Sequence, residues 1–205
     1  RATQFGEGVY EVLAVVNGKL IDSELHFDRL DRSLRELEME MSSSRTTLKL
    51  ILREVVRLNR LTEGICYLQV SRGTAPRNHT FPNKPSYSLI VTARRSQPAT
   101  GKIGIEGVHV ITTADQRWQR RDIKSVSLLP NVLAKQKAAE AGAFEAWLIH
   151  NDGIITEGSH SNAWIVGDSG TVITHHESID ILSGVTRNRV LQVARSDGVK
   201  VIERA

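Results

Sequence analysis

The sequence predicts an α+β fold made of two lobes. Its strand-like runs are mostly joined by short turns, and runs with helical periodicity separate the groups of strands. The stretch 96–102 contains Gly and Pro and no large apolar residue, which indicates a linker. We therefore expect lobes at residues 1–98 and 103–205. A doubly wound nucleotide-binding sheet is not expected, because the chain has neither a G-x-G-x-x-G motif nor a P-loop.

The first lobe is expected to begin with a β-hairpin. Residues 9–16 are β-branched and apolar, and Asn17-Gly18 separates them from the shorter run 19–21. Asn-Gly favours a tight hairpin turn because both residues tolerate positive φ. The elements expected next are a helix through Leu30, Leu34, Leu37 and Met41, a helix over 46–58, strands over 65–70 and 87–92, and a loop over 72–79.

The second lobe is expected to alternate strands with two helices. Pro130 favours the start of a helix, since a proline in the first turn loses no hydrogen-bond donor that the helix needs. Gly142 is a suitable stop for this helix. The other expected elements are strands over 108–113, 145–150, 163–166, 171–174 and 199–202, and a helix that follows Ser183-Gly184.

Composition excludes several classes of protein. Of the 205 residues, 40% are apolar and 24% charged, unlike a disordered, collagen-like or rod-shaped chain. No uncharged apolar run reaches the length of a membrane span, and no signal peptide is recognisable. The single cysteine, Cys66, excludes an internal disulfide and favours a reducing, cytoplasmic setting. The net charge is +4, but basic and acidic residues are interleaved, so we do not expect binding of nucleic acid.

Two stretches carry groups that suit covalent and acid–base chemistry. Lys124 lies between an expected strand and an expected helix, next to Arg120 and Arg121. A lysine amine becomes a nucleophile when neighbouring cations and an apolar pocket lower its pKa. Glu157 stands among small polar residues at the end of a hairpin strand, where a carboxylate can hold a proton on a ring nitrogen. For either stretch alone, a solvated loop or a polar turn is the simpler interpretation.

Three further positions suit binding of anions. The start of the helix after Ser183-Gly184 offers backbone N–H groups to a phosphate, although Ser183 could simply cap that helix. Arg29 can bind a phosphate or pair with an acid on its own helix surface. Arg77 and His79 share one side of an extended loop, which suits a carboxylate, although loop solvation also explains them.

No metal site is predicted. His109, His175 and His176 have no partners at the spacing of metal ligands.

Together these stretches resemble the class IV aminotransferases, the fold-type IV family that depends on pyridoxal 5′-phosphate. The matching stretches are Phe5-Gly6-Glu7-Gly8-Val9-Tyr10-Glu11, His26-Phe27-Asp28-Arg29-Leu30, Asp122-Ile123-Lys124-Ser125, Asn131-Val132-Leu133-Ala134-Lys135 and Thr156-Glu157-Gly158-Ser159-His160-Ser161-Asn162, followed by Gly184-Val185-Thr186-Arg187. Their order and spacing agree along essentially the whole chain. The resemblance implies a small N-terminal α/β lobe and a larger, β-rich lobe that binds the cofactor.

Within this family the chain looks most like the D-amino-acid (D-alanine) aminotransferases. The distinguishing stretch is residues 71–79, which contains the Arg-x-His pair Arg77 and His79. The resemblance implies that this pair reaches across a homodimer and holds the substrate α-carboxylate together with Tyr10. It implies transfer of an amino group between a D-amino acid and a 2-oxo acid. Alternatives in the same family are a branched-chain aminotransferase, an (R)-amine transaminase and an aminodeoxychorismate lyase.

The resemblance also assigns roles around the cofactor. Lys124 would form a Schiff base with pyridoxal 5′-phosphate and later move the proton, and Glu157 would contact the pyridine nitrogen. Arg29 would bind the phosphate, assisted by the backbone N–H groups of Val185 and Thr186.

The chain departs from the family pattern in two ways. His160 replaces a serine that is common in the family, and its bulk is expected to narrow the side-chain pocket or alter a hydrogen bond near the cofactor. The family's first strand and C-terminal segment are missing, and the chain starts at Arg1 rather than Met. We therefore expect a chain truncated at both ends, with an incomplete second lobe.

Overall fold

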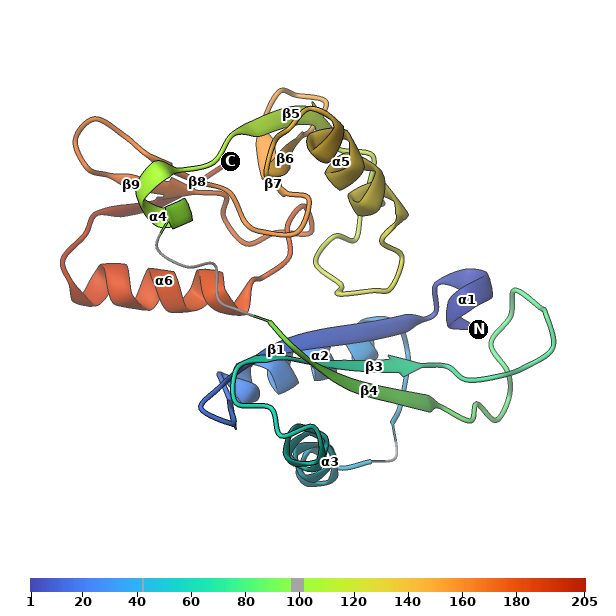
Figure 1. Ribbon diagram of the computed structural model, residues 1–205. Helices are drawn as coiled ribbons and strands as arrows, with labels where there is room; N and C mark the ends of the chain where they lie inside the picture. The colour runs from blue at the N-terminus through green and yellow to red at the C-terminus, as the bar shows by residue number, and fades with distance from the viewer. Residues whose placement is uncertain (42, 97–101) are drawn as a thin grey trace. The chain divides into compact units, whose positions relative to one another are not determined.

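The computed structural model of the chain describes residues 1–41, 43–96 and 102–205 (Figure 1). Most of the expected linker, 96–102, therefore lies outside the described residues. The chain divides into two compact units: Arg1–Thr100 with Ile123–Ser127, and Gly101–Asp122 with Leu128–Ala205. The lobe limits 1–98 and 103–205 stay a prediction. The segment Ile123–Ser127 belongs to the second lobe in that prediction, but in the structure it packs with the first unit.

An antiparallel sheet of four strands forms the centre of the first unit (Figure 1). Its order is β2 (Lys19–Leu20), β1 (Gly8–Val16), β3 (Gly64–Ser71) and β4 (Ser88–Arg95). The expected hairpin is confirmed, because β1 pairs with β2 and both turn residues have positive φ, 49° at Asn17 and 72° at Gly18. The short β2 leaves β1 and β3 as the long central pair.

Two helices cover the sheet of the first unit. Helix α2 (Ser23–Glu36) packs on β1, and α3 (Arg45–Leu58) packs on β3 and β4. The helix predicted through Leu37 and Met41 is too long, because Glu38 has a φ of 52°, which a helical residue does not adopt. The short helix α1 (Ala2–Phe5) was not predicted. The core between helices and sheet includes Val9, Val15, Leu30, Leu34, Leu48, Leu52, Val56, Leu68 and Val70.

The segment Ile123–Ser127 joins the first unit through backbone hydrogen bonds to β1. The N–H of Tyr10 donates to the carbonyl of Lys124 at 3.0 Å, and the N–H of Val126 donates to the carbonyl of Gly8 at 3.0 Å. Gly6 has a φ of 70°, and a Cβ there would lie 2.2 Å from Oγ of Ser127. These contacts fix the backbone of Lys124 beside Tyr10.

The second unit contains two small sheets. One has the order β5 (Val110–Ala114), β6 (Glu145–Ile149) and β7 (Ile155–Gly158). The other has the order β10 (Val201–Glu203), β9 (Val172–Thr174) and β8 (Trp164–Val166).

Two of the strand pairs in the second unit are parallel and joined by helices. Helix α5 (Leu129–Glu140) lies between β5 and β6 in the chain, and α6 (Val185–Ser196) lies between β9 and β10. The β6–β7 and β8–β9 pairs are antiparallel, as expected of hairpins. Helix α4 (Lys102–Glu106) was not predicted, because its start fell in the expected linker.

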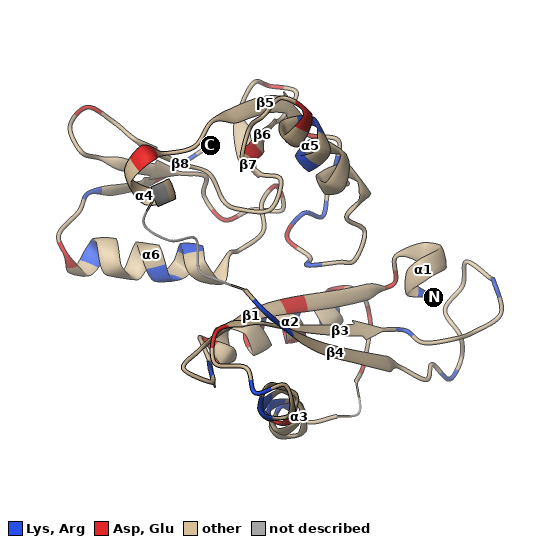
Figure 2. Ribbon diagram, viewed as in Figure 1, with Lys and Arg blue, Asp and Glu red and all other residues tan. Residues whose placement is uncertain are grey.

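Charged residues are spread over both units. Acidic and basic residues are interspersed along the described chain rather than gathered by sign (Figure 2). Among the described residues, no helix is long and apolar enough to cross a membrane.

The packing of α3 generates a test of the core. Leu52 is 0% exposed and Leu50 is 60% exposed, although both lie on α3. Leu52→Ala is expected to lower the free energy of unfolding by about 2–5 kcal/mol, because it leaves a cavity. Leu50→Ala is the matched control and is expected to change it by about 0.5 kcal/mol or less. Urea unfolding of both variants measures this, and equal losses would contradict the packing described.

Candidate active site

In the first unit, a buried carboxylate organises two side chains that come from α2. Glu11 on β1 is 0% exposed. It accepts hydrogen bonds from Nε and Nη2 of Arg29 at 2.8 and 2.7 Å, and its Oε2 lies 2.7 Å from Nδ1 of His26. Arg29 therefore pairs with a buried acid of the sheet.

Glu11 stays ionised despite its burial. Burial raises the pKa of the Glu11 carboxyl, but hydrogen bonds from Arg29 and His26 and the positive charges of Arg29 and Lys124 outweigh it, so the pKa lies below its ordinary value. The result is a fixed anion that orients the guanidinium plane of Arg29. Sequence reasoning missed this role of Glu11, although Glu11 ends one of the matching stretches.

Lys124 and Tyr10, two of the expected site residues, lie together in the first unit. Nζ of Lys124 lies 4.4 Å from the centroid of the Tyr10 ring, a cation–π geometry. The Tyr10 ring stacks on Tyr67 with centroids 5.6 Å apart, and the Tyr67 hydroxyl donates to Gln69 at 2.6 Å. Sequence reasoning missed Tyr67, which meets Tyr10 only through the register of β1 with β3.

Arg77 and His79 lie together on the exposed loop that follows β3. The His79 ring meets the Phe5 ring edge-on with centroids 5.3 Å apart, and the Arg77 guanidinium lies 5.5 Å from the Phe5 centroid. The stretch from residue 72 to 87, all of it described, contains no strand, so Phe5 and not strand alternation brings the two groups together.

A buried arginine anchors the start of this loop. Nε of Arg72 donates to Glu7 at 2.9 Å, and Nη1 donates to the carbonyl of Glu38 at 2.9 Å. The guanidinium of Arg72 also lies 3.7 Å from the centroid of the Phe81 ring. Both ends of the segment that carries Arg77 and His79 are thereby held to the first unit.

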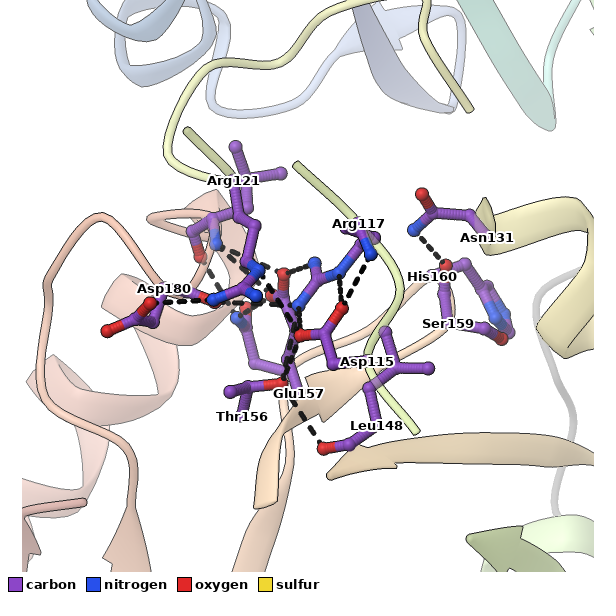
Figure 3. Close-up of polar contacts among 12 residues, drawn as sticks. Asp115, Arg117, Arg121, Asn131, Leu148, Thr156, Glu157, Ser159, His160 and Asp180 are labelled. Atoms are coloured by element: carbon purple, nitrogen blue, oxygen red, sulfur yellow. Dashed lines mark hydrogen bonds and ion pairs between the residues drawn. The ribbon is translucent and has the colours of Figure 1, made fainter. Parts of the chain in front are cut away.

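In the second unit, Glu157 on β7 is buried among hydrogen-bond donors (Figure 3). One oxygen accepts from Nη1 of Arg117, and the other accepts from Nδ2 of Asn162 at 3.0 Å. The backbone N–H of Leu182 lies 3.2 Å from the second oxygen and 3.3 Å from the first. Three donors therefore direct four hydrogen bonds at the Glu157 carboxylate.

The pKa of the Glu157 carboxyl lies above its ordinary value. Burial raises this pKa, the charge and hydrogen bond of Arg117 and the N–H of Leu182 lower it, and the negative charge of Asp115 raises it again. Burial is the largest of these effects.

Arg117 is held by a second acid. Its Nε and Nη2 donate to the two oxygens of Asp115 at 2.9 and 2.7 Å, and its own backbone N–H donates to Asp115 at 3.1 Å. The hydroxyl of Thr156 donates to Asp115 at 2.9 Å. Arg117 and Asp115 were not predicted, because nothing in the local sequence distinguishes a buried ion pair from surface charges.

The start of α6, which contains Val185 and Thr186, packs against the Glu157 network. Gly184 is the N-terminal flanking residue, and a Cβ there would lie 2.1 Å from Oδ1 of Asn162. The N-terminal flanking residue Gly184 has no side chain to cap the helix. The Ser183 hydroxyl donates to Glu177 at 2.6 Å and accepts from Nδ2 of Asn188, a residue of α6, at 3.3 Å. The interpretation of Ser183 as a cap stays a prediction.

His160 turns toward Glu145. Nδ1 and the backbone N–H of His160 lie 2.7 and 2.8 Å from Oε1 of Glu145, and the Ser161 hydroxyl donates to Oε2 at 2.6 Å. Burial raises the pKa of Glu145, but the hydrogen bonds from His160 and Ser161 outweigh it and lower the pKa to about 2. His160 thus contributes a partner to a buried carboxylate that the sequence did not reveal.

Among the described residues, no three or more His, Cys, Asp or Glu side chains are grouped as they would be to hold a metal ion.

The chain is similar to known proteins over its whole length. Residues 8–205 match the family described as amino-transferase class IV. The chain is 41% identical over 210 residues to a D-alanine aminotransferase of Bacillus licheniformis, covering 100% of this chain and 71% of the relative. It is 41% identical over 205 residues to a D-alanine aminotransferase of Listeria innocua, covering 99% of this chain and 70% of the relative.

Solved structures share the fold. A branched-chain amino acid aminotransferase from Escherichia coli superimposes with a TM-score of 0.88 at 23% identity, over 99% of this chain and 68% of that chain. A 4-amino-4-deoxychorismate lyase from Pseudomonas aeruginosa superimposes with a TM-score of 0.81 at 26% identity, over 100% of this chain and 75% of that chain.

Because the pKa of Glu145 is lowered in the folded protein, the free energy of unfolding should depend on pH through this residue. The folded pKa of about 2 lies below the ordinary value of 4.5, so ionised Glu145 stabilises the fold above pH 4.5 and this contribution is lost as the pH falls toward 2. Glu145→Gln is expected to lower the free energy of unfolding at pH 7 by on the order of 3 kcal/mol. The deficit relative to the parent protein should shrink by more than half at pH 3.

Urea unfolding at both pH values measures this effect. Glu140→Gln is the matched control, because Glu140 is an exposed residue at the end of α5 and should change stability little at either pH. A deficit of equal size at pH 7 and pH 3 would show that the charge of Glu145 is not what stabilises the fold.

Proposed function

Since the chain belongs to the class IV aminotransferases, we propose that it transfers an amino group between a D-amino acid of the D-alanine type and a 2-oxo acid. The observation that supports this substrate class most strongly is full-length similarity to D-alanine aminotransferases. The pair Arg77 and His79 beside Phe5 adds support, because it offers positive groups to a substrate carboxylate.

Enzymes of this family use pyridoxal 5′-phosphate, and the residues described above fit that cofactor. Arg29 is a guanidinium oriented by a buried acid, and the N-terminal flanking residue of α6 is Gly184, which has no side chain to cover the first backbone N–H groups. Both features suit a phosphate. Glu157 is a buried carboxylate, and a negative charge of this kind suits a protonated ring nitrogen. When bound, the cofactor supplies an electron-withdrawing ring that makes the Cα–H of the amino acid acidic.

We assign the covalent and proton-transfer roles to Lys124. Its Nζ would hold the cofactor, and the amine, once free, would take the proton from the substrate Cα and hold it until it is given back to the cofactor–substrate adduct. A positioned general base of this kind contributes roughly 10²–10⁴-fold to the rate. The backbone of Lys124 is fixed by β1, and its amine lies on the face of Tyr10, which limits the positions that Nζ can occupy.

The other proposed roles concern binding. Arg29 and the N–H groups of Val185 and Thr186 hold the phosphate, and Glu157 keeps the ring nitrogen protonated. Tyr10 contributes to the site that receives the substrate carboxylate.

We further propose that the chain forms a homodimer, in which Arg77 and His79 serve the site of the other subunit. Both residues are exposed on a loop whose start is anchored by Arg72 and which contacts Phe5 through His79. Their exposure leaves them accessible to a partner subunit. A cytoplasmic location is part of the same proposal, because the one cysteine, Cys66, is a buried free thiol.

Replacing Lys124 tests the covalent role. Lys124→Ala is expected to abolish the visible absorbance band of the bound cofactor and to lower turnover of D-alanine by at least ~10²-fold, because the general base is lost. Lys137→Ala, at an exposed position of α5, should change neither. Absorbance spectra and steady-state kinetics measure both effects, and an unchanged band in Lys124→Ala would remove Lys124 from its role.

Replacing Arg77 tests the substrate class. Arg77→Ala is expected to raise KM for D-alanine about 10–100-fold, because one charge-assisted hydrogen bond to the substrate carboxylate is lost. The cofactor content should stay the same. A primary (R)-amine without a carboxylate is the control substrate, and its KM should not change. Equal KM values for D-alanine in both proteins would contradict the role of Arg77. Preference of the parent protein for L-leucine would instead favour a branched-chain aminotransferase.

A further inference from the structure

We propose that Arg117 is a positioning residue that keeps Glu157 ionised and oriented toward a cationic ring nitrogen, and that Asp115 limits this effect by competing for Arg117. The inference rests on the proposed function, in which Glu157 faces that nitrogen. It concerns only the second unit.

Positive and negative side chains alternate along one network of the second unit (Figure 3). Arg117 joins Glu157 to Asp115. Arg121 then joins Asp115 to Asp180, with its Nε 3.3 Å from Asp115 and its Nη1 2.6 Å from Asp180. Among the described residues, the chain of ion pairs thus runs from Glu157 to Asp180 with a carboxylate at each end.

This network carries a net negative charge when its carboxylates are ionised. Three carboxylates and two guanidinium groups leave one surplus negative charge. The side chain of Asp180 is 40% exposed, whereas the side chains of Glu157 and Arg117 are 6% and 8% exposed. Water can solvate the Asp180 end, but not the Glu157 end, and an uncompensated buried charge is costly. The buried end therefore suits an additional cation.

Arg117 divides its hydrogen-bond donors unequally between Asp115 and Glu157. Three of its N–H groups, at Nε, Nη2 and the backbone, are directed at Asp115, and Nη1 is directed at Glu157. Burial raises the pKa of Asp115, but the hydrogen bonds and the charge of Arg117 outweigh it, so this pKa is lowered overall. Asp115 therefore stays ionised and offsets part of the positive charge that Glu157 experiences.

Substitutions of Arg117 and Asp115 should therefore shift the pKa of Glu157 in opposite directions. Removing the charge of Arg117 removes the two largest effects that oppose burial, so the pKa of Glu157 rises and a neutral carboxyl no longer retains the ring proton. Removing the charge of Asp115 lets Arg117 act more strongly on Glu157, so the pKa of Glu157 falls. A purely structural role for the network would not produce shifts of opposite sign.

The direct experiment follows the Glu157 carboxyl by ¹³C NMR in the full chain without added cofactor, with Glu157→Gln used to assign the signal. Arg117→Gln is expected to raise the midpoint of titration by about 1–3 pH units, and Asp115→Asn is expected to lower it by about 1 unit. Arg117→Lys keeps the charge and should stay near the parent value. Arg57→Gln is the control, because Arg57 is exposed and pairs only with Glu54 among the contacts described for it.

A second readout uses the protein loaded with pyridoxal 5′-phosphate that carries ¹⁵N at the ring nitrogen. In the parent protein and in Arg57→Gln the ring nitrogen should be protonated at neutral pH. In Arg117→Gln the protonated fraction should fall, with the equilibrium shifted at least ~10-fold, and Arg117→Lys should restore it.

The outcomes separate this inference from the proposed function. Equal midpoints for the parent protein and Arg117→Gln, or shifts of the same sign in Arg117→Gln and Asp115→Asn, would overturn the inference even if the cofactor binds normally. If Arg117→Gln does not fold, Arg117→Lys and Asp115→Asn decide, since a midpoint in Asp115→Asn that does not fall contradicts the competition. If the carboxyl titrates as expected but the parent protein binds no cofactor, the proposed function fails and the electrostatic inference survives.

Discussion

The burial of carboxylates against guanidinium groups is the constraint on which the candidate site depends. In the first unit, Glu11 is wholly buried; the guanidinium of Arg29 matches its charge, and Nδ1 of His26 lies within hydrogen-bond distance. In the second unit, Arg117 plays the corresponding part for Glu157. Each buried anion costs free energy unless its partners are held in place, so the strands and helices that carry these partners are fixed with respect to one another within each unit. The same pairing orients Arg29 and Glu157, the groups that we propose hold the cofactor.

The arrangement of polar groups also explains how one fold supports several chemistries. The solved structures that resemble this chain include an aminotransferase and a lyase, so the fold alone does not select the reaction or the substrate. In this chain the groups that suit a substrate carboxylate lie on a loop, anchored by Arg72 and resting on Phe5. A loop anchored by a buried arginine can change its exposed residues without disturbing the sheet that carries Tyr10.

Much of the fold was predictable because it depends on local signals. The hairpin at Asn17-Gly18 and the helix of residues 45–58 follow from turn chemistry and apolar periodicity. Other features were not predictable, because they depend on contacts between residues far apart in the sequence. Tyr67 meets Tyr10 through the register of β1 with β3, and Arg72 donates to the carbonyl of Glu38. Buried ion pairs, such as that of Arg117, have no sequence pattern, since either partner alone resembles a surface charge.

The central claim is that the amine of Lys124 carries the cofactor. The most direct measurement is mass spectrometry of peptides from the protein after incubation with pyridoxal 5′-phosphate and reduction with borohydride, which fixes the cofactor to any amine that holds it. The account predicts one modified peptide, with the added mass on Lys124. Modification of another lysine, or a protein that stays unmodified, would contradict it.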